Sequence, residues 1–399
     1  MELLIKGARV VDCDSDFIGD VYIKDGKIAE IGENIERSAH TIQANGLTLL
    51  PAFTDLHCHF RDPGFTYKED IETGAKAAVK GGFTTVNLMA NTKPVCSSLD
   101  TVKYVLEKSN NLKLVDIHQC MSITKNLEGK SIEHLEELAL ENELVKFISD
   151  DGKGVADSKI MLEAMLRAKE LELTVISHAE SPELSNIDMR LAENLMTWRD
   201  IELSKYTGCS LHMAHVSTKE AMEYVIKAKD GGYKVTCEVM PHHIALTEAV
   251  EYRVNPPLRK KEDVEVLIAA IQKGYVDAIA TDHAPHSKED KANGAPGISG
   301  IETAFAVCFT ALVKPGHISL NKLSELMSKN PSEIMKMKKG KVRIGYEADL
   351  VLADIDTAYE IDVNEFSSKG KNSPFHGFKV NGKIISTIKA GELVYEAQV

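Results

Sequence analysis

The feature that most constrains the fold is a repeated alternation of strand-like and helix-like stretches between residues 51 and 341. Eight apolar runs have the length and composition of buried parallel strands: residues 52–57, 83–89, 114–120, 145–149, 173–178, 210–215, 233–238 and 276–281. Most are followed by a stretch of helical composition, such as YKEDIETGAKAAVK or KKEDVEVLIAAIQKG. Eight such repeats that close on themselves form a TIM barrel. An open doubly wound sheet is the alternative, but no glycine-rich nucleotide-binding fingerprint follows any of the runs.

Short strand-like runs and turn signals occupy both ends of the chain. Hairpin signals occur at Lys24-Asp25-Gly26-Lys27 and at Asn45-Gly46, and the C-terminal end has a turn at Val380-Asn381-Gly382-Lys383. Neither end is large enough to bury a sheet by itself, so we expect the two ends to meet. The sequence therefore predicts an α/β chain with a (β/α)8 barrel over residues 51–341 and a small composite β-domain built from residues 1–50 and 342–399.

Composition excludes several classes of partner. A chain of 399 residues with 43% hydrophobic content is sufficient for one barrel and an appendage. The net charge of −13 would repel nucleic acids and anionic membrane surfaces. No apolar run is long enough to span a bilayer, and no secretory signal pattern begins the chain. The 7 scattered cysteines form no CxxC pair and indicate reduced thiols, so we expect a cytoplasmic protein with no nucleic-acid or membrane partner.

The stretch DLHCHFRDPG places two histidines at the end of the first predicted strand. His57 and His59 are two residues apart, so on a strand both side chains point the same way and suit one metal ion. Arg61 follows two residues after His59, so on a strand it would lie on the same side, and its guanidinium can bind a carboxylate through two hydrogen bonds. Each has a simpler interpretation, because the short HxH pattern also occurs at ordinary polar strand ends. Arg61 could equally form a salt bridge with Asp62 or Glu69.

A barrel predicts functional groups at the C-terminal ends of several strands, because these ends surround one face. Besides the two histidines, suitable residues follow the second, fourth, fifth, sixth and eighth runs: Asn91, Asp150 and Asp151, His178, His215 and Asp282. Four histidines and two aspartates would converge and could bind two metal ions. Because adjacent residues on an extended chain point apart, only one of Asp150 and Asp151 is expected to reach the metals. His212 lies three residues before His215, so it should face the opposite way and is interpreted as structural.

Other polar groups near this ring suit a reaction on a small anion. Asp282 could contact a metal ion and accept a proton from the water that the ion activates, as a general base does. Arg61, Asn91 and His286 could bind a substrate carboxylate through charged and amide hydrogen bonds. The polar, glycine-containing stretch 287–297 is expected to move over the site as a lid.

These motifs resemble those of the bacterial class I dihydroorotases of the amidohydrolase superfamily. The shared segments are DLHCHFRDPG, YKEDIETGAKAAVKGGFTT, NT, SDDG, HVST, NPPLR, ATDHAPH and PGI, in this order from about residue 4 to about residue 394. The resemblance implies a zinc-dependent barrel enzyme of de novo pyrimidine biosynthesis. Its reaction would be the reversible cyclisation of N-carbamoyl-L-aspartate to L-dihydroorotate and water, by metal-activated hydroxide with Asp282 as general acid and base.

The resemblance also implies roles for individual residues. The metal ligands would be His57, His59, Asp151, His178, His215 and Asp282, with Asp151 bridging the metal site and one or two zinc ions bound per subunit. Many amidohydrolases have a carboxylated lysine at the bridging position, and the aspartate here implies that none is present. Substrate contacts would come from Arg61, Asn91, Asn255, His286 and the backbone near Pro296 and Gly297. Where the family usually reads MPNT, this chain reads Met89-Ala90-Asn91-Thr92, which frees the backbone before Asn91.

Two other functions are compatible with parts of the pattern. A hydantoinase or allantoinase would share the barrel and the metals, but would more often have the bridging lysine and would have less use for a carboxylate clamp. A non-catalytic dihydroorotase-like subunit of aspartate transcarbamoylase would typically have lost metal ligands, whereas all six are present here. The resemblance also leaves open a homodimer and an association of the active enzyme with aspartate transcarbamoylase.

Overall fold

The computed structural model describes residues 2–139 and 141–397. Within this part of the chain, the barrel strands are β6 (Phe53–Cys58), β7 (Phe83–Leu88), β8 (Asp116–Gln119), β9 (Phe147–Ile148), β10 (Thr174–Ser177), β11 (Ser210–Met213), β12 (Val235–Val239) and β13 (Ala278–Ile279). They form two parallel sheets, β6-β7-β8 and β9 to β13. Parallel bridges from Met121 to Ile148 and from Cys58 to His283 join the sheets at both seams. The predicted TIM barrel is confirmed, and the open doubly wound sheet is wrong.

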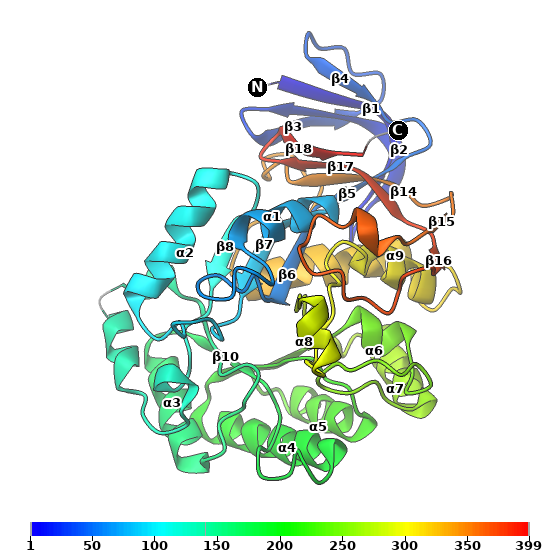
Figure 1. Cartoon of the computed structure of the whole chain (residues 1–399). Coiled ribbons are helices and arrows are strands. Elements are labelled where there is room, and N and C mark those ends of the chain that lie inside the picture. The colour runs from blue at the N-terminus through cyan, green and yellow to red at the C-terminus, as the bar shows by residue number, and fades with distance from the viewer. Residues whose placement is uncertain (1, 140, 398–399) are drawn as a thin grey trace.

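Helices surround the strands as an outer ring (Figure 1). The long helices are α1 (Ile71–Lys80), α2 (Leu99–Leu112), α3 (Ser158–Glu170), α4 (Met189–Thr207), α5 (Lys219–Asp230) and α7 (Lys261–Gln272). Short 3-10 turns, η1 (Lys125–Leu127), η2 (Glu133–Ala139) and η3 (Asn142–Leu144), connect β8 to β9. The remaining elements of the barrel half are α6 (Pro241–Ala245), α8 (Lys288–Ala292), α9 (Ala304–Cys308), η4 (Phe309–Val313), α10 (Leu320–Ser324), η5 (Glu325–Lys329) and α11 (Asn330–Ile334).

Both ends of the chain contribute to one eight-stranded sheet, as predicted. The N-terminal end supplies β1 (Glu2–Val11), β2 (Asp16–Lys24), β3 (Lys27–Gly32), β4 (His40–Gln43) and β5 (Thr48–Pro51). The C-terminal end supplies β14 (Leu350–Asp354), β17 (Lys383–Lys389) and β18 (Glu392–Glu396). The two ends meet where β5 pairs antiparallel with β14, with Leu350 opposite Pro51. A separate hairpin-like pair, β15 (Tyr359–Glu360) and β16 (Lys379–Val380), flanks the 3-10 turn η6 (Val363–Glu365).

Of the two predicted hairpin turns, one is correct and the other is wrong. Asp25 and Gly26, with φ of 51° and 75°, connect the antiparallel strands β2 and β3. The Asn45-Gly46 turn joins β4 to β5, but both of these strands pair in parallel with β1. On one side, β1 pairs with β4 before Gly7 and with β5 after it. Gly7 has a φ of 70°, and the register between β1 and β2 shifts here. The Asn381-Gly382 turn joins β16, which pairs with β15, to β17, which pairs with β14 and β18.

The β-domain sheet continues directly into the first barrel strand. The apolar run that reads as one strand in the sequence ends its pairing with β14 at Pro51 and begins its pairing with β7 at Phe53. Phe53 is fully buried at this joint. Its ring stacks on that of Phe305, with 5.0 Å between centroids, and lies edge-on to that of Phe83 at 5.4 Å. The joint therefore fixes the start of the strand that ends in the two histidines.

Replacing Phe53 by alanine should lower the free energy of unfolding by about 3 to 5 kcal/mol, because the change removes a buried ring and leaves a cavity. Denaturant titration followed by circular dichroism would measure the loss. The control is Phe17→Ala on β2, where the side chain is 37% exposed and the expected loss is below about 1 kcal/mol. Equal unfolding midpoints for the Phe53 variant and the unaltered protein would contradict the role of the joint.

Candidate metal centre

The six residues predicted as metal ligands come together at the C-terminal end of the barrel. Each lies at or just beyond the end of its strand: His57 and His59 at β6, Asp151 after β9, His178 after β10, His215 after β11 and Asp282 after β13. All six residues are buried, and the most exposed of them, Asp282, is 7% exposed. The chain therefore gathers imidazole and carboxylate groups in one buried place.

Two groups of ligand atoms share Asp151. The ligand atoms of His57, His59 and Asp151 lie within 4.8 Å of one another, and so do those of Asp151, His178 and His215. Asp151 Oδ1 is 3.2 Å from His57 Nε2 and 3.1 Å from His178 Nδ1. Asp151 Oδ2 is 3.4 Å from His59 Nε2. The carboxylate lies between the two groups, in the position that a bridging ligand of two cations requires.

Asp282 lies beside the first group, whereas Asp150 faces away from both. Asp282 Oδ1 is 3.1 Å from His59 Nε2 and 3.7 Å from His57 Nε2. Although burial opposes ionisation, these two histidines lower the pKa of Asp282 below its ordinary value. Asp150 accepts hydrogen bonds from the backbone N–H of Thr124, at 2.9 Å, and from its hydroxyl. Asp150 therefore fixes the loop that presents its neighbour.

The residues present fit divalent metal ions. His57 Nε2 is buried and has no hydrogen-bond partner among the described residues. His178 Nδ1 and His215 Nε2 face each other at 2.9 Å, with Asp151 next to both. Although burial would raise it, His57, His178 and His215 hold the pKa of Asp151 well below its usual range. Ring nitrogens that converge on an ionised carboxylate are the donor set that zinc and similar divalent cations bind.

Two glutamates that the sequence reasoning missed, the buried Glu238 and the half-buried Glu180, contact the outer ring nitrogens of two ligand histidines. Glu238 Oε1 is 2.8 Å from His57 Nδ1, and Glu180 Oε2 is 2.9 Å from His178 Nε2. Burial opposes ionisation, but the bonds from His212 and His57 lower the pKa of Glu238 to about 2. An ionised carboxylate only accepts hydrogen bonds, so each histidine must donate there and keeps its other nitrogen free for a metal. Glu238 lies in β12, one of the two predicted strands to which no functional residue was assigned, and this gap was the available signal.

The prediction that His212 faces away from the site is wrong. Its Nε2 is 3.0 Å from Glu238 Oε2 and its Nδ1 is 2.8 Å from Thr236 Oγ1, so it lies inside the barrel and supports Glu238. The alternation rule fails because β11 ends at Met213 and His215 has a left-handed backbone with φ of 36°.

Left-handed backbone also occurs at two other site residues, Arg61 with φ of 58° and Asp282 with φ of 45°. Such conformations cost about 1 to 3 kcal/mol each and persist only where the surroundings impose them. Next to Asp282, the buried carboxylate of Asp55 accepts hydrogen bonds from Thr281 N at 2.9 Å and from Thr281 Oγ1 at 2.5 Å. This anchor connects the eighth strand to the first and holds Asp282 in its strained position.

Arg61 is available to bind an anion. The salt bridges considered for it do not form, because Asp62 pairs with Lys108 at 2.6 Å and Glu69 accepts hydrogen bonds from the hydroxyls of Thr73 and Ser368. Its own polar contacts among the described residues are Pro285 O at 3.4 Å and the ring of His286 at 3.3 Å. A guanidinium that lacks a carboxylate partner is suited to a carboxylated ligand.

The other residues predicted to contact substrate are arranged around the ligand histidines. Asn91 Oδ1 is 2.9 Å from His59 Nδ1, and its Nδ2 donates to Asp151 Oδ2 at 3.2 Å. Asn255 Nδ2 donates to Glu180 Oε2 at 2.7 Å, and its buried Oδ1 has no partner in the described part of the chain. Both amides therefore contact groups of the candidate metal centre.

The predicted lid, residues 287–297, forms the short helix α8 and a following loop that contains Pro296 and Gly297. Figure 1 shows α8 inside the ring of outer helices. Lys291 Nζ donates to the backbone oxygens of Arg253, Ala295 and Gly297 at 2.9 to 3.0 Å. These bonds fasten the loop, and Gly297 with φ of 137° adopts a backbone that suits glycine alone. Whether the segment moves stays a prediction.

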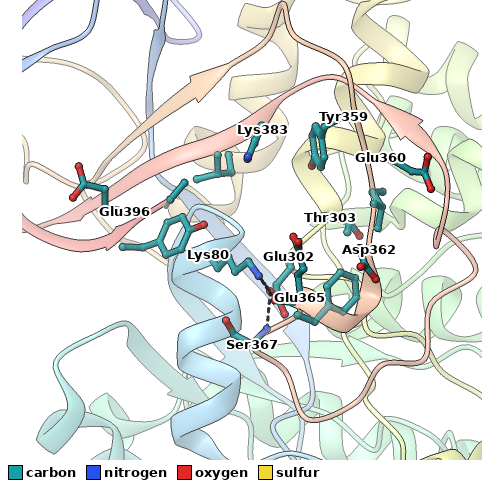
Figure 2. A pocket seen from close by; sticks show the side chains of 15 residues that line it. Lys80, Glu302, Thr303, Tyr359, Glu360, Asp362, Glu365, Ser367, Lys383 and Glu396 are labelled. Atoms are coloured by element: carbon teal, nitrogen blue, oxygen red, sulfur yellow. Dashed lines mark hydrogen bonds and ion pairs between the residues drawn. The ribbon is translucent and has the colours of Figure 1, made fainter. Parts of the chain in front are cut away.

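Two other clusters of polar residues are separate from this centre. A surface pocket of about 760 Å³, drawn in Figure 2, is lined by the end of α1, by the residues just before α9 and by the C-terminal segment, and an ion pair of 3.2 Å joins Lys80 to Glu302 among the lining residues. None of the six ligand residues lines it. The acidic group of Asp116, Glu347 and Asp349 is paired with lysines: Lys339 Nζ lies within 3.0 Å of all three, and Lys389 Nζ lies 2.8 Å from Asp116.

Comparisons with known proteins agree with this geometry. Residues 48–394 match the model of the amidohydrolase family. The chain is 56% identical over 398 residues to the dihydroorotase of Clostridium botulinum (strain Eklund 17B / Type B), covering 99% of this chain and 100% of that protein. It is 41% identical over 426 residues to the dihydroorotase of Acetivibrio thermocellus, covering 100% of both. The crystal structure of dihydropyrimidinase from Brevibacillus agri NCHU1002 is similar with a TM-score of 0.91 and 26% identity, over 99% of this chain and 95% of that one.

Replacing Glu238 by glutamine should weaken metal binding about 10- to 100-fold, because the amide no longer fixes His57 with its Nε2 free. Competition with a chelator, followed by metal analysis of the protein, would measure this loss. The control is Glu193→Gln, another buried glutamate, which contacts Ser217 and Arg259 instead of a ligand histidine. If the Glu238 variant retained metal as well as the control does, the positioning role would be wrong.

Proposed function

This chain belongs to the dihydroorotases of the amidohydrolase family, and we propose that it interconverts N-carbamoyl-L-aspartate and L-dihydroorotate plus water in de novo pyrimidine biosynthesis. It is a hydrolase of the cyclic amide in one direction and closes the ring in the other. The observation that carries this function is the 56% identity over 99% of the chain, since the site residues lie within the matched length. The scaffold alternative, which would have lost metal ligands, is disfavoured because all six predicted ligands are present together.

The proposed cofactor is zinc, with two ions per subunit. His57, His59 and Asp282 would hold one ion, His178 and His215 would hold the other, and Asp151 would bridge them. When bound, the ions supply the electrophile that polarises the amide carbonyl and the charge that makes water acidic enough to attack at neutral pH.

No carboxylated lysine is proposed at the bridge. The lysines near Asp151 in the sequence point to other places: Lys146 Nζ donates to Met335 O at 2.6 Å, and Lys153 Nζ donates to Leu127 O at 3.4 Å. Neither lysine therefore takes the bridging position, which supports Asp151 in this role.

Asp282 is proposed as the general acid and base. In the direction of hydrolysis its carboxylate would take a proton from the attacking water and give it to the ring nitrogen that leaves. In ring closure the same carboxylate would carry the proton in the opposite direction. Its placement beside His59 and its rigid attachment through Thr281 and Asp55 support this role, because proton transfer requires a fixed distance between donor and acceptor.

Substrate recognition is proposed to depend on the carboxylate that both substrates carry. Arg61 would bind it through paired hydrogen bonds, with His286 and Asn91 beside the guanidinium and with Asn255 and the backbone near Pro296 and Gly297 against the ring. Burial, followed by the charges of Arg61 and Lys68, lowers the pKa of His286 to about 3, so the ring is neutral at pH 7 and adds no charge. Arg61 therefore provides the local positive charge in a chain of net charge −13.

The location and the domain boundaries are also proposals. We place the protein in the cytoplasm because its 7 cysteines are unpaired and most are buried. Among the described residues, no helix combines the length and the apolar character needed to cross a membrane. The proposed division into residues 51–341 and the two flanking segments is supported by the sheets, in which β5 is the last β-domain strand before the barrel and β14 the first one after it.

Removal of metal should abolish hydrolysis of L-dihydroorotate, with a loss of about 100-fold or more that added zinc reverses. Elemental analysis of the purified protein and an absorbance assay before and after chelation would measure both quantities. Bound metal without dihydroorotate turnover would instead favour another cyclic amidohydrolase, such as a hydantoinase. Absence of metal and of turnover, even after zinc is added, would favour the non-catalytic scaffold.

Replacing Arg61 by glutamine should raise KM for L-dihydroorotate about 10- to 100-fold, because a charge-assisted contact to the carboxylate is lost. Residual turnover of hydantoin, a cyclic amide without a carboxylate, should stay unchanged in the same variant. The control is Arg37→Gln, which removes an exposed arginine that pairs with Glu30 in the β-domain. An equal effect on both cyclic amides would show that Arg61 is not the carboxylate clamp.

A further inference from the structure

A loop of the C-terminal segment reaches the metal centre from outside the barrel. It spans residues 366–378, between η6 and β16, and Figure 1 shows it in orange and red, extending toward α8. The sequence predicts no functional residue in this segment, which lies in the range 342–399 expected for the β-domain. Its contacts, however, are made with two loops that carry residues of the candidate site.

The side chain of Asn372 joins the two ends of the loop that follows the eighth barrel strand. Its Oδ1 accepts hydrogen bonds from His286 N and from Ser299 Oγ, both at 2.9 Å. Its Nδ2 donates to Gly297 O at 3.1 Å and to Ala284 O at 3.4 Å. An amide side chain has two donors and two acceptor sites, so all four are used on one loop. The bonds cross the base of this loop, because two of the partners lie near its start and two near its end.

The backbone around Asn372 fits closely against the same loop. Ser299 N donates to Asn372 O at 2.7 Å. A Cβ atom at Gly370 would lie 2.6 Å from Pro285 Cβ and 2.8 Å from Ser299 Oγ, which is too close for a side chain. The two stretches of chain therefore approach to a distance that only glycine permits. This packing fixes the place from which Asn372 contacts the loop.

The same segment also holds the loop that begins with Arg61. Lys369 N donates to Glu69 Oε1 at 3.2 Å, and Lys369 Nζ donates to Thr66 O at 2.6 Å. The guanidinium of Arg61 contacts the ring of His286, in the other loop, at 3.3 Å. Both halves of the proposed carboxylate clamp are therefore attached to one short stretch of the C-terminal segment.

We propose that Asn372 is a positioning residue for substrate recognition, which holds the backbone of His286 and Gly297 where the carboxylate and the ring of the substrate bind. This inference rests on the proposed function for the identity of the substrate. Asn372 acts through these two residues and does not touch the reacting atoms. The metal centre is anchored by other groups, such as Glu238 and Asp55. Loss of Asn372 should therefore weaken substrate binding more than it slows the chemical step.

Replacing Asn372 by alanine should raise KM for L-dihydroorotate about 10-fold and change kcat less than about 3-fold, because hydrogen bonds that fix the binding groups are lost. Steady-state kinetics would measure both values. The same change should then be made in the Arg61→Gln variant. If Asn372 acts through the carboxylate clamp, its loss should raise KM less than about 3-fold once Arg61 is absent. A change that only lowered stability would act equally in both backgrounds.

The matched control is Asn381→Ala, in the same C-terminal segment. Asn381 is buried, and its side-chain contacts among the described residues are Asp356 O at 2.8 Å and Lys314 Nζ at 2.5 Å. This variant should keep the KM of the unaltered protein. A milder second variant is Ser299→Ala, which removes one of the four bonds of Asn372 and should raise KM about 3-fold.

Hydrogen exchange followed by mass spectrometry tests the positioning without any substrate. In Asn372→Ala, the backbone amides of residues 284–299 should exchange about 10-fold faster or more, whereas in Asn381→Ala they should not. Unchanged exchange in this loop, an unchanged KM, or a rise in KM of equal size with and without Arg61 would overturn the proposal. If the unaltered protein did not act on dihydroorotate but the loop still lost its protection in Asn372→Ala, the proposed function would be wrong and the positioning of the loop would be supported.

Discussion

The buried carboxylate of Asp151 is the interaction on which the rest of the site depends. An ionised carboxylate in the interior of a barrel is costly unless positive charge surrounds it. Four histidines from three strands provide the ring nitrogens around it, and two further carboxylates, Glu238 and Glu180, fix two of these histidines from behind. The arrangement concentrates negative charge around the ring nitrogens, which is stable when cations occupy the space between them. The catalytic potential of the fold is therefore a consequence of how this one charge is compensated.

Much of the fold and part of the site could be read from the sequence, because both follow from local periodicity. Short apolar runs that alternate with helices predict parallel strands, and parallel strands in a barrel end on one face. That logic found His57, His178 and Asp282 without knowledge of any distance. It failed for β4 and β5, because a strand's partner depends on residues far along the chain. It failed again for His212, because the left-handed backbone at His215 interrupts the alternation on which the inference depended. Glu238 was missed because the role of a glutamate inside a strand can be inferred only when the histidines that it contacts are known.

The same scaffold serves more than one cyclic amide among the similar proteins. The fold superimposes closely on a dihydropyrimidinase, whereas full-length identity is higher to dihydroorotases. Barrel closure and ligand placement therefore do not determine the substrate. At the edge of the metal centre this chain has Arg61, whose backbone is left-handed and whose guanidinium has no carboxylate partner among the described residues. Selectivity in such a site comes from loops at the strand ends, which can change while the barrel stays the same.

The joint between the β-domain and the barrel has a consequence for how the chain folds during synthesis. Strand β5 leads without a break into the first barrel strand, yet its neighbour β14 begins only at Leu350. The N-terminal strands can pair with one another early, but the ribosome must complete the whole barrel segment before β5 can pair with β14. Until then, β5 presents an open edge, which is prone to pair with other chains. The β-domain sheet is therefore completed last, when β14 pairs with β5 and joins the two ends of the polypeptide.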